Sequence, residues 1–213
     1  KYIVINDLPK VVKTFKKNWH TAHFRDQFQR NALSRGLKNF DEDDLVMISD
    51  LDEIPNPKSI KEFKQENKYG CFVQKNFLYK LNLFNITEPN WYGTRMCRKK
   101  HLKSPQWLRE IKTRKLPFYK FYKPKFDKFI IDGGWHFSSV KNPEGIKKKL
   151  NSYAEQQFNS DKFKNIETIK EKIDQRKDLF DRGYDYRILK IDDNFPNYVI
   201  KNQQKLKEYI YLD

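Results

Sequence analysis

Leu45-Val46-Met47-Ile48-Ser49-Asp50-Leu51-Asp52-Glu53 is the stretch of sequence that decides the fold. Its first four residues are a continuous apolar run, which is typical of a central strand covered on both faces. A polar turn at residues 41–44 precedes the run, and clustered carboxylates follow it directly. The pattern predicts a buried strand whose carboxyl end is strongly acidic.

The segments around this strand alternate between strand and helix patterns. Short apolar runs predict strands at 2–5, 69–77 and 129–131, whereas helical spacing and Pro positions predict helices over about 19–37, 57–65, 143–158 and 162–180. Residues 85–128 are expected to form loops with one short helix. This alternation predicts an α/β domain, in which ligands collect beyond the carboxyl ends of the strands.

The composition fits one packed domain over residues 1–213. Hydrophobic residues make up 38% and aromatic residues 15%, which is enough aromatic surface for a core, and no Ser/Gly-rich linker divides the chain. Only two cysteines are present, Cys71 and Cys97, so we expect reduced thiols. No apolar run approaches the ~20 residues that span a bilayer. We therefore expect no membrane segment in this chain, and a cytoplasmic protein of bacterial or viral type rather than one of the Golgi lumen.

The chain is strongly basic, with a formal charge of +16 from 44 Lys+Arg and 28 Asp+Glu. Such an excess attracts anionic partners of any chemistry, so a non-enzymatic domain that binds nucleic acid or another polyanion is the competing class. The basic residues are scattered, and the best-organised feature of the sequence is acidic, which would repel phosphates. We therefore predict no nucleic-acid partner.

The acidic strand end has the residue types of a metal site. In extended geometry Asp50 and Asp52 point to the same side, where both carboxylates face one ion. A hard cation such as Mn²⁺ or Mg²⁺ fills its remaining positions with water or substrate phosphate and stabilises a departing diphosphate. One alternative is an acidic turn that caps the next helix. A second is a phosphatase with an Asp nucleophile, but Glu53 and Ile54 stand where a Thr or Val is usual.

The second predicted strand end is Asp132-Gly133-Gly134-Trp135-His136. Asp132 is the first candidate for a general base, with Glu53 next. His136 is a candidate third metal ligand, and Trp135 offers an apolar face on which a sugar ring can stack. The alternative is a tight turn with a core Trp and a hydrogen-bonded His.

A third segment, Asn90-Trp91-Tyr92-Gly93-Thr94-Arg95, supplies candidate substrate-binding residues. Arg95 has the chemistry to pair with phosphate oxygens, and Trp91 is a candidate substrate contact. Packing accounts for Trp91 equally well. Arg30, on the predicted first helix, is a candidate partner for one of the site carboxylates.

Three colinear segments together resemble glycosyltransferase family 17, the β-1,4-mannosyl-glycoprotein β-1,4-N-acetylglucosaminyltransferase family. They are residues 28–31 leading to 44–55, residues 91–95, and residues 132–138 with Ser152-Tyr153-Ala154-Glu155. The resemblance implies a GT-A-like (Rossmann-like) mixed sheet flanked by helices, a UDP-GlcNAc donor, a glycan acceptor of the N-glycan kind, a divalent cation and inversion at the anomeric carbon. Asp50 and Asp52 match the metal-binding motif of the family, and Glu155 becomes a candidate substrate-binding residue and a reserve base.

The start of the chain departs from the family pattern. Such enzymes begin with a βαβ unit that holds the nucleotide base, and Lys1 to Asp7 resembles a later strand of that unit. We therefore expect an N-terminally truncated fragment that lacks part of this unit, and an inactive transferase is a third interpretation. The leading expectation is a metal-dependent glycosyltransferase that acts by single displacement.

Overall fold

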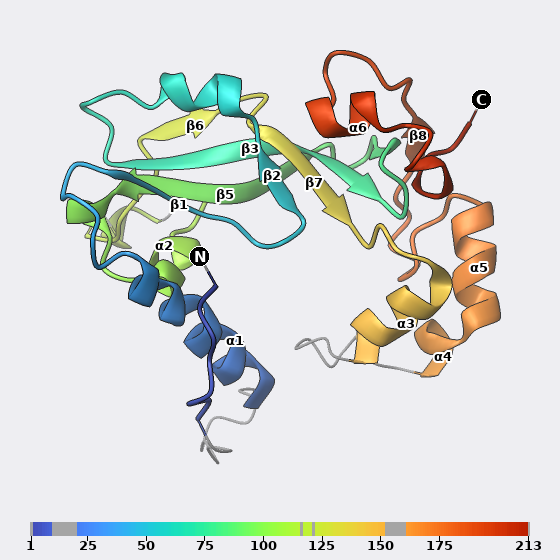
Figure 1. The fold of residues 1–213 in the computed structure, drawn as a ribbon, viewed down its shortest axis with the longest axis horizontal. Helices are drawn as coiled ribbons and strands as arrows, with labels where there is room; N and C mark the ends of the chain where they lie inside the picture. Colours follow the sequence, from blue (N-terminus) through green and yellow to red (C-terminus); the bar gives the residue numbers. More distant parts are fainter. Residues whose placement is uncertain (1, 10–20, 116, 121, 152–160, 213) are drawn as a thin grey trace. The chain divides into compact units, whose positions relative to one another are not determined.

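The computed structural model describes residues 2–9, 21–115, 117–120, 122–151 and 161–212 (Figure 1). The chain divides into two compact units. The first contains Lys1–Ile48, Phe63–Cys71 and Arg95–Phe129, and the second contains Ser49–Glu62, Phe72–Thr94 and Ile130–Asp213. Two long strands, β3 (Tyr69–Leu78) and β5 (Asn90–Arg98), contribute residues to both units.

The first unit packs helices against a strand pair. Strand β1 (Leu45–Ile48) is antiparallel to the end of β5, with Ile48 opposite Arg95. Helix α1 (Thr21–Ala32) contacts α2 (Pro105–Glu110), which begins after the N-cap residue Ser104. The unit also contains three 3₁₀ helices, η1 (Leu33–Gly36), η3 (Lys99–His101) and η4 (Phe118–Lys120), and β6 (Lys128–Ile130) begins in it. Its core includes Val46, Ile48, Cys71, Cys97 and Leu108.

The strand predicted at residues 45–48 is confirmed, but its predicted burial on both faces is wrong. Leu45 and Met47 are 38% and 37% exposed, whereas Val46 and Ile48 are buried. The reason is that β1 packs on the core of the first unit through one face only. The strand predicted at residues 2–5 is also wrong. Tyr2 is 99% and Val4 75% exposed, and residues 2–9 form no regular element.

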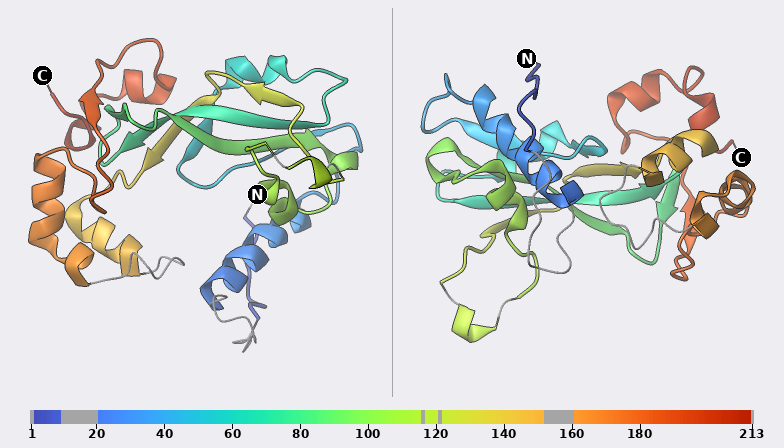
Figure 2. Two further views of the ribbon diagram at one scale, coloured as in Figure 1. Left: turned by 180° about the vertical axis from the view of Figure 1, so that it is seen from behind. Right: turned by 90° about the horizontal axis from the view of Figure 1, so that it is seen from below.

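The second unit is built around β7 (Gly134–Ser138), which lies between two other strands. It is antiparallel to β2 (Glu53–Pro55) and parallel to β3. Strand β4 (Leu83–Asn85) pairs with β3 and with β8 (Tyr186–Ile188), both antiparallel. Helix α3 (Pro143–Asn151) packs against α5 (Ile166–Asp174), as Figure 2 shows. The remaining elements are α4 (Asp161–Lys164), α6 (Asn197–Lys201), η2 (Pro57–Glu62) and η6 (Lys207–Tyr209). The predicted α/β class with a mixed sheet is therefore confirmed.

Several predicted boundaries shift. The first helix is confirmed over the described residues as α1 and η1, and the helix expected at 57–65 is the shorter 3₁₀ helix η2. The helix expected at 143–158 is α3 up to Asn151, and its remainder lies outside the described residues. The helix expected at 162–180 is interrupted at Asn165, which caps α5 through its side chain. Residues 90–98 were expected to form a loop but form strand β5. Gly93, Arg95 and Arg98 interrupt the apolar pattern by which a buried strand is normally recognised.

The two thiols of the chain give a direct test of the first unit's core. Cys71 and Cys97 are not in a disulfide and are fully buried, and burial raises the pKa of Cys97 to about 12. Because the thiolate is the reactive form, we expect native protein at pH 8 to react very slowly with a disulfide reagent such as DTNB. Reaction should become fast once urea unfolds the chain. Rapid modification of Cys97 in native protein would contradict this packing.

Candidate active site

The acidic motif forms a tight turn at the end of β1. The backbone N–H of Glu53 donates to the carbonyl of Asp50 at 3.0 Å, and Leu51 stands fully exposed at the tip. The hydroxyls of Ser49 and Thr94, 2.7 Å apart, tie the turn to β5. The extended geometry expected for Asp50 and Asp52 is therefore wrong. Both side chains nevertheless line one cavity. The two carboxylates therefore lie on the same cavity, as the sequence predicted, although a turn and not an extended strand places them there.

Glu53 holds this turn in place from within. Its side chain is buried, its Oε2 accepts a hydrogen bond from the backbone N–H of Asp50 at 3.2 Å, and its Oε1 accepts one from Trp91 Nε1 at 2.9 Å. In the β2–β7 register Glu53 lies opposite His136. Since both carboxylate oxygens already accept hydrogen bonds, Glu53 is a positioning residue in this structure, and its predicted role as a reserve base stays a prediction.

His136 is held in one tautomer by its neighbours. Asn76 donates through Nδ2 to the carbonyl of Glu88 at 3.1 Å, so the Oδ1 of Asn76 faces the Nδ1 of His136 at 3.0 Å. Because an amide oxygen accepts only, Nδ1 of the neutral ring carries the hydrogen and Nε2 has a free lone pair. Nε2 lies 3.8 Å from Oδ1 of Asp52. The site therefore directs a neutral imidazole nitrogen and a carboxylate toward each other.

Two further features define the environment of His136. Its ring stacks on Trp91 with 4.0 Å between centroids and 10° between planes. Burial lowers the pKa of His136 below its ordinary value, although the nearby Asp52, Glu53 and Asp50 carboxylates oppose that shift. The imidazole therefore stays neutral to a lower pH than a solvated histidine does, which keeps its nitrogen available as a ligand.

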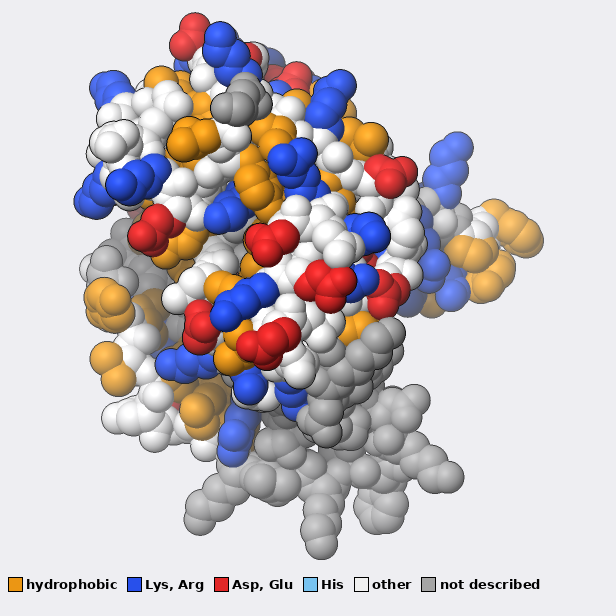
Figure 3. Space-filling model, turned by 90° about the vertical axis from the view of Figure 1, so that its right-hand side faces the viewer, with side chains coloured by type: hydrophobic (Ala, Val, Ile, Leu, Met, Phe, Trp, Pro, Cys, Tyr) orange, Lys and Arg blue, Asp and Glu red, His pale blue; other side chains and the backbone are white. Residues whose placement is uncertain are grey.

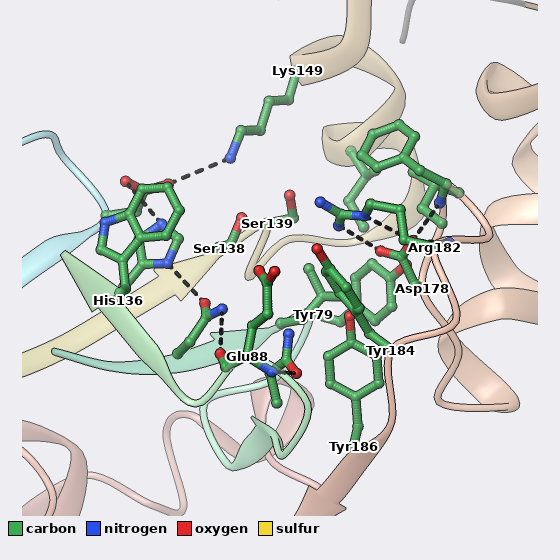
Figure 4. A pocket seen from close by; sticks show the side chains of 18 of the residues that line it. Tyr79, Glu88, His136, Ser138, Ser139, Lys149, Asp178, Arg182, Tyr184 and Tyr186 are labelled. Carbon is green, nitrogen blue, oxygen red and sulfur yellow. Dashed lines mark hydrogen bonds and ion pairs between the residues drawn. The ribbon is translucent and has the colours of Figure 1, made fainter. Parts of the chain in front are cut away.

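The cavity behind these residues has a volume of about 530 Å³ (Figure 4). Lys149, from α3, reaches toward the acidic end, with Nζ 3.4 Å from Oδ2 of Asp52. Away from His136 the lining includes Glu88, Arg182, Tyr184 and Tyr186. A volume of this size is in the range of ordinary ligand pockets.

The predicted metal ligands Asp50, Asp52 and His136 thus line the same cavity. Within the described residues, no group of three or more His, Cys, Asp or Glu side chains is arranged to hold a metal ion. The closest approach among the predicted ligands that the structure gives is the 3.8 Å between Asp52 and His136. Metal binding by these three residues stays a prediction.

The other residues of the second predicted strand end lie elsewhere in the second unit. Asp132 has a positive φ of 49°, its side chain is 77% exposed, and its Oδ1 is 3.8 Å from Nζ of Lys75. It lines a different hollow, of about 570 Å³, together with Trp135 and Asn194. Trp135 is buried in the core and donates from Nε1 to the carbonyl of Asn194 at 2.9 Å. The faces of its indole are therefore largely taken up by packing.

Two predicted arginines belong to the first unit. Arg95 is buried, donates to Cys71 Sγ at 2.8 Å, and stacks over Phe126 at 5.0 Å from the ring centroid. Arg30 pairs with Asp26, one helical turn away, at 3.1 Å. Glu155 lies outside the described residues. From the predicted set, the structure therefore brings together five residues, which are Asp50, Asp52, Glu53, Trp91 and His136.

Sequence reasoning missed Asn76, Glu88, Lys149 and Tyr184, which all take part in this cavity or line it. Lys149 was one of many scattered lysines, and its place on the inner side of α3 depends on how α3 packs. Asn76 lies opposite His136 in the parallel β3–β7 register. No local motif marks such a residue, because the pairing depends on strands that are far apart in the sequence.

The matched sequence family identifies the class of protein, which is a glycosyltransferase. A family model described as glycosyltransferase family 17 matches residues 6–207. The chain therefore belongs to glycosyltransferase family 17, as the three motifs predicted. Comparisons with curated proteins and with solved structures gave no match. Among the described helices, none has the length and apolar character needed to cross a membrane.

Proposed function

We propose that this protein is a metal-dependent, inverting glycosyltransferase that moves N-acetylglucosamine from UDP-GlcNAc to a hydroxyl of a glycan. The observation that carries the proposal is the pair formed by Asp52 and His136. A carboxylate oxygen and an imidazole nitrogen with a free lone pair face each other at 3.8 Å beside Asp50, inside a cavity of ligand size.

A divalent cation fits the chemistry of this pair. Lys149 already lies 3.4 Å from the other oxygen of Asp52, and a cation between Asp52 and His136 would further reduce the repulsion between their two electron-rich atoms. Carboxylate oxygens and a neutral imidazole nitrogen are ligands that Mn²⁺ accepts, while Mg²⁺ prefers the oxygens. Mg²⁺ is often held by one or two carboxylates plus substrate phosphates, so a smaller protein ligand set is sufficient when the donor is bound. Asp50, Asp52 and His136 would hold the cation.

The protein side chains divide the work of transfer. When bound, the cation supplies positive charge that stabilises the departing nucleoside diphosphate. Lys149 adds an ammonium group beside Asp52, where it can contact phosphate oxygens. Asn76 fixes the tautomer of His136, and Glu53 fixes the turn that carries Asp50 and Asp52. A carboxylate then takes the proton of the acceptor hydroxyl. Asp132, the first candidate from the sequence, lines the other hollow, and its role as the base stays a prediction.

The experiment that tests this function is a screen of nucleotide sugars with and without Mn²⁺. Isothermal titration should show UDP-GlcNAc binding that requires the cation, and hydrolysis or transfer should follow the same requirement. The variant Asp50→Ala/Asp52→Ala should lose the cation-dependent binding. Equal binding by wild type and variant, or binding that is indifferent to Mn²⁺, would contradict the proposal.

Binding of nucleic acid or another polyanion remains the competing function, and it predicts strongly salt-dependent affinity without need for a divalent ion. The face shown in Figure 3 carries Lys and Arg side chains interspersed with Asp and Glu. A cavity lined by Asp50, Asp52 and Glu88 is unfavourable for a phosphate chain unless a cation is present. These observations favour the transferase.

The hydrogen bond between Asn76 and His136 gives a prediction specific to the metal site. Asn76→Ala removes the acceptor that holds Nδ1–H, and we expect Mn²⁺ affinity in the presence of UDP to fall about 10–100-fold. Thermal stability should change little by comparison, because Asn76 is only half-buried. Titration of Mn²⁺ by calorimetry measures the effect, and Asn197→Ala is a control outside the cavity. Unchanged Mn²⁺ affinity would remove Asn76 from this role.

A further inference from the structure

The end of the cavity beyond Glu88 lies away from His136 (Figure 4). It is lined by Glu88, Tyr184, Tyr186 and Arg182, with the hydroxyls of Ser138 and Ser139 beside them (Figure 4). In this view Glu88 stands between His136 on one side and Tyr184 with Arg182 on the other. The carboxylate of Glu88 would repel a second phosphate, so this end suits a neutral ligand rich in hydroxyl groups.

Arg182 forms an ion pair with the buried carboxylate of Asp178 at this end of the cavity. Its Nε and Nη2 donate to Asp178 at 3.0 and 2.6 Å, and Asp178 is buried. Asp178 also accepts hydrogen bonds from the backbone N–H groups of Phe180 and Arg182. The guanidinium lies 4.5 Å from the centroid of Tyr184 and 5.3 Å from that of Phe180. Arg182 therefore neutralises Asp178 and fixes the ring of Tyr184 in place.

Tyr184 and Glu88 form the polar part of this end. Burial raises the pKa of the Tyr184 phenol, and the nearby Glu88 carboxylate raises it further. The phenol therefore stays protonated and donates, while the carboxylate of Glu88 keeps further acceptor capacity toward the cavity. An aromatic ring beside a carboxylate is a combination that suits a sugar, whose C–H face packs on the ring and whose hydroxyls donate to the carboxylate.

The wall between the two ends has an unusual backbone. Ser139 and Tyr79 both have positive φ, 55° and 60°, and the N–H of Tyr79 donates to the carbonyl of Ser138 at 3.0 Å. Positive φ at a residue other than glycine costs free energy and persists where the surrounding structure enforces it, often at ligand sites. Here it places two serine hydroxyls on the cavity between His136 and Tyr184.

From these contacts we infer that the Glu88–Tyr184 end is the subsite for the acceptor sugar, and that Glu88 takes the proton from the attacking hydroxyl. This inference rests on the proposed transferase function. In the step, the acceptor oxygen forms a bond to the anomeric carbon of the donor as its proton moves to the Glu88 carboxylate. The bond between that carbon and the phosphate oxygen breaks, and its electron pair leaves with the nucleoside diphosphate. The two ends of the cavity thus hold the two substrates.

The first test of the subsite is direct binding of a sugar, which requires no turnover. Saturation-transfer NMR with methyl N-acetyl-β-glucosaminide and methyl β-mannoside should detect binding to wild type, with UDP and Mn²⁺ present. Tyr184→Ala should weaken it about tenfold, whereas Tyr198→Ala, which removes an exposed tyrosine of α6, should not. If wild type binds neither glycoside, or Tyr184→Ala binds as wild type does, the subsite is overturned. Failure of the transferase function alone would leave this result intact.

The second test separates the acceptor sugar from the donor sugar. Glu88→Gln keeps the size of the side chain, and we expect transfer to fall about 100-fold or more while the dissociation constants of UDP-GlcNAc and UDP change less than about twofold. Loss of the affinity difference between UDP-GlcNAc and UDP would assign this end to the donor sugar and overturn the inference. Full transfer by Glu88→Gln would also overturn it, and Asp132→Asn, measured in parallel, then tests the base predicted from the sequence.

Discussion

Asp52→Asn is expected to lower transfer by about 100- to 1,000-fold, because one preorganised charge at the diphosphate is lost. Asp52 lies between two other residues of the proposed site. One of its oxygens is 3.8 Å from His136 Nε2, and the other is 3.4 Å from Lys149 Nζ. The substitution preserves the shape of the side chain and removes only its charge. Its effect therefore reports on cation and phosphate binding rather than on packing.

The measurement is kcat/KM for UDP-GlcNAc over a range of Mn²⁺ concentrations. A partial recovery of Asp52→Asn at high Mn²⁺ is expected if the loss is mainly one of cation affinity. Asp193→Asn is the matched control, because Asp193 lines the separate hollow near Trp135 and not the cavity of Asp52. Wild-type kinetics and wild-type Mn²⁺ dependence in Asp52→Asn would contradict both the metal site and the proposed mechanism.

Gly134→Ala is expected to destabilise the protein by about 3 kcal/mol or more. Gly134 has φ of +131°, which side-chain-bearing residues rarely adopt, and a Cβ there would lie 2.0 Å from the carbonyl oxygen of Ile54. That oxygen belongs to the backbone of β2, so it cannot move aside without breaking the β2–β7 pairing. Since Glu53 and His136 are opposite one another in the same pairing, Mn²⁺ binding should weaken as well.

Gly183→Ala separates the two causes of this destabilisation. Gly183 also has a positive φ, +75°, but a Cβ there would meet no atom within 4 Å. Urea unfolding of both variants therefore compares backbone strain alone with strain plus collision, and the Gly134→Ala midpoint should be clearly the lower. Equal midpoints would show that β2 and β7 do not approach as closely as the structure indicates.

The sequence was sufficient for the α/β class, for the strand at residues 45–48 and for the carboxylates that follow it. What it lacked was the pairing of distant strands. Asn76 and Glu53 both lie opposite His136 in the sheet. Asn76 belongs to β3, which is parallel to β7, and Glu53 belongs to β2, which is antiparallel to it. Neither contact leaves a signal in the local sequence.

The alternation of side-chain direction along β7 explains why the residues of one predicted site line two separate cavities. Adjacent residues of a strand point to opposite faces, so Trp135 and His136 cannot both face the same ligand. His136 faces the cavity with Asp52, whereas Trp135 faces the core and the hollow that Asp132 lines. The sequence predicts candidate site residues all along the motif from Asp132 to His136, but its last residues belong to strand β7.

The stacking of Trp91 on His136 makes the site observable by light. An indole in contact with an imidazole changes its fluorescence when the imidazole gains a positive partner, and here the rings are 4.0 Å apart. Emission of Trp91, isolated as the difference between wild type and Trp91→Phe, should therefore follow the occupancy of His136 as Mn²⁺ is added. Trp91 is therefore an intrinsic fluorescence probe next to His136, one of the residues proposed to bind the cation.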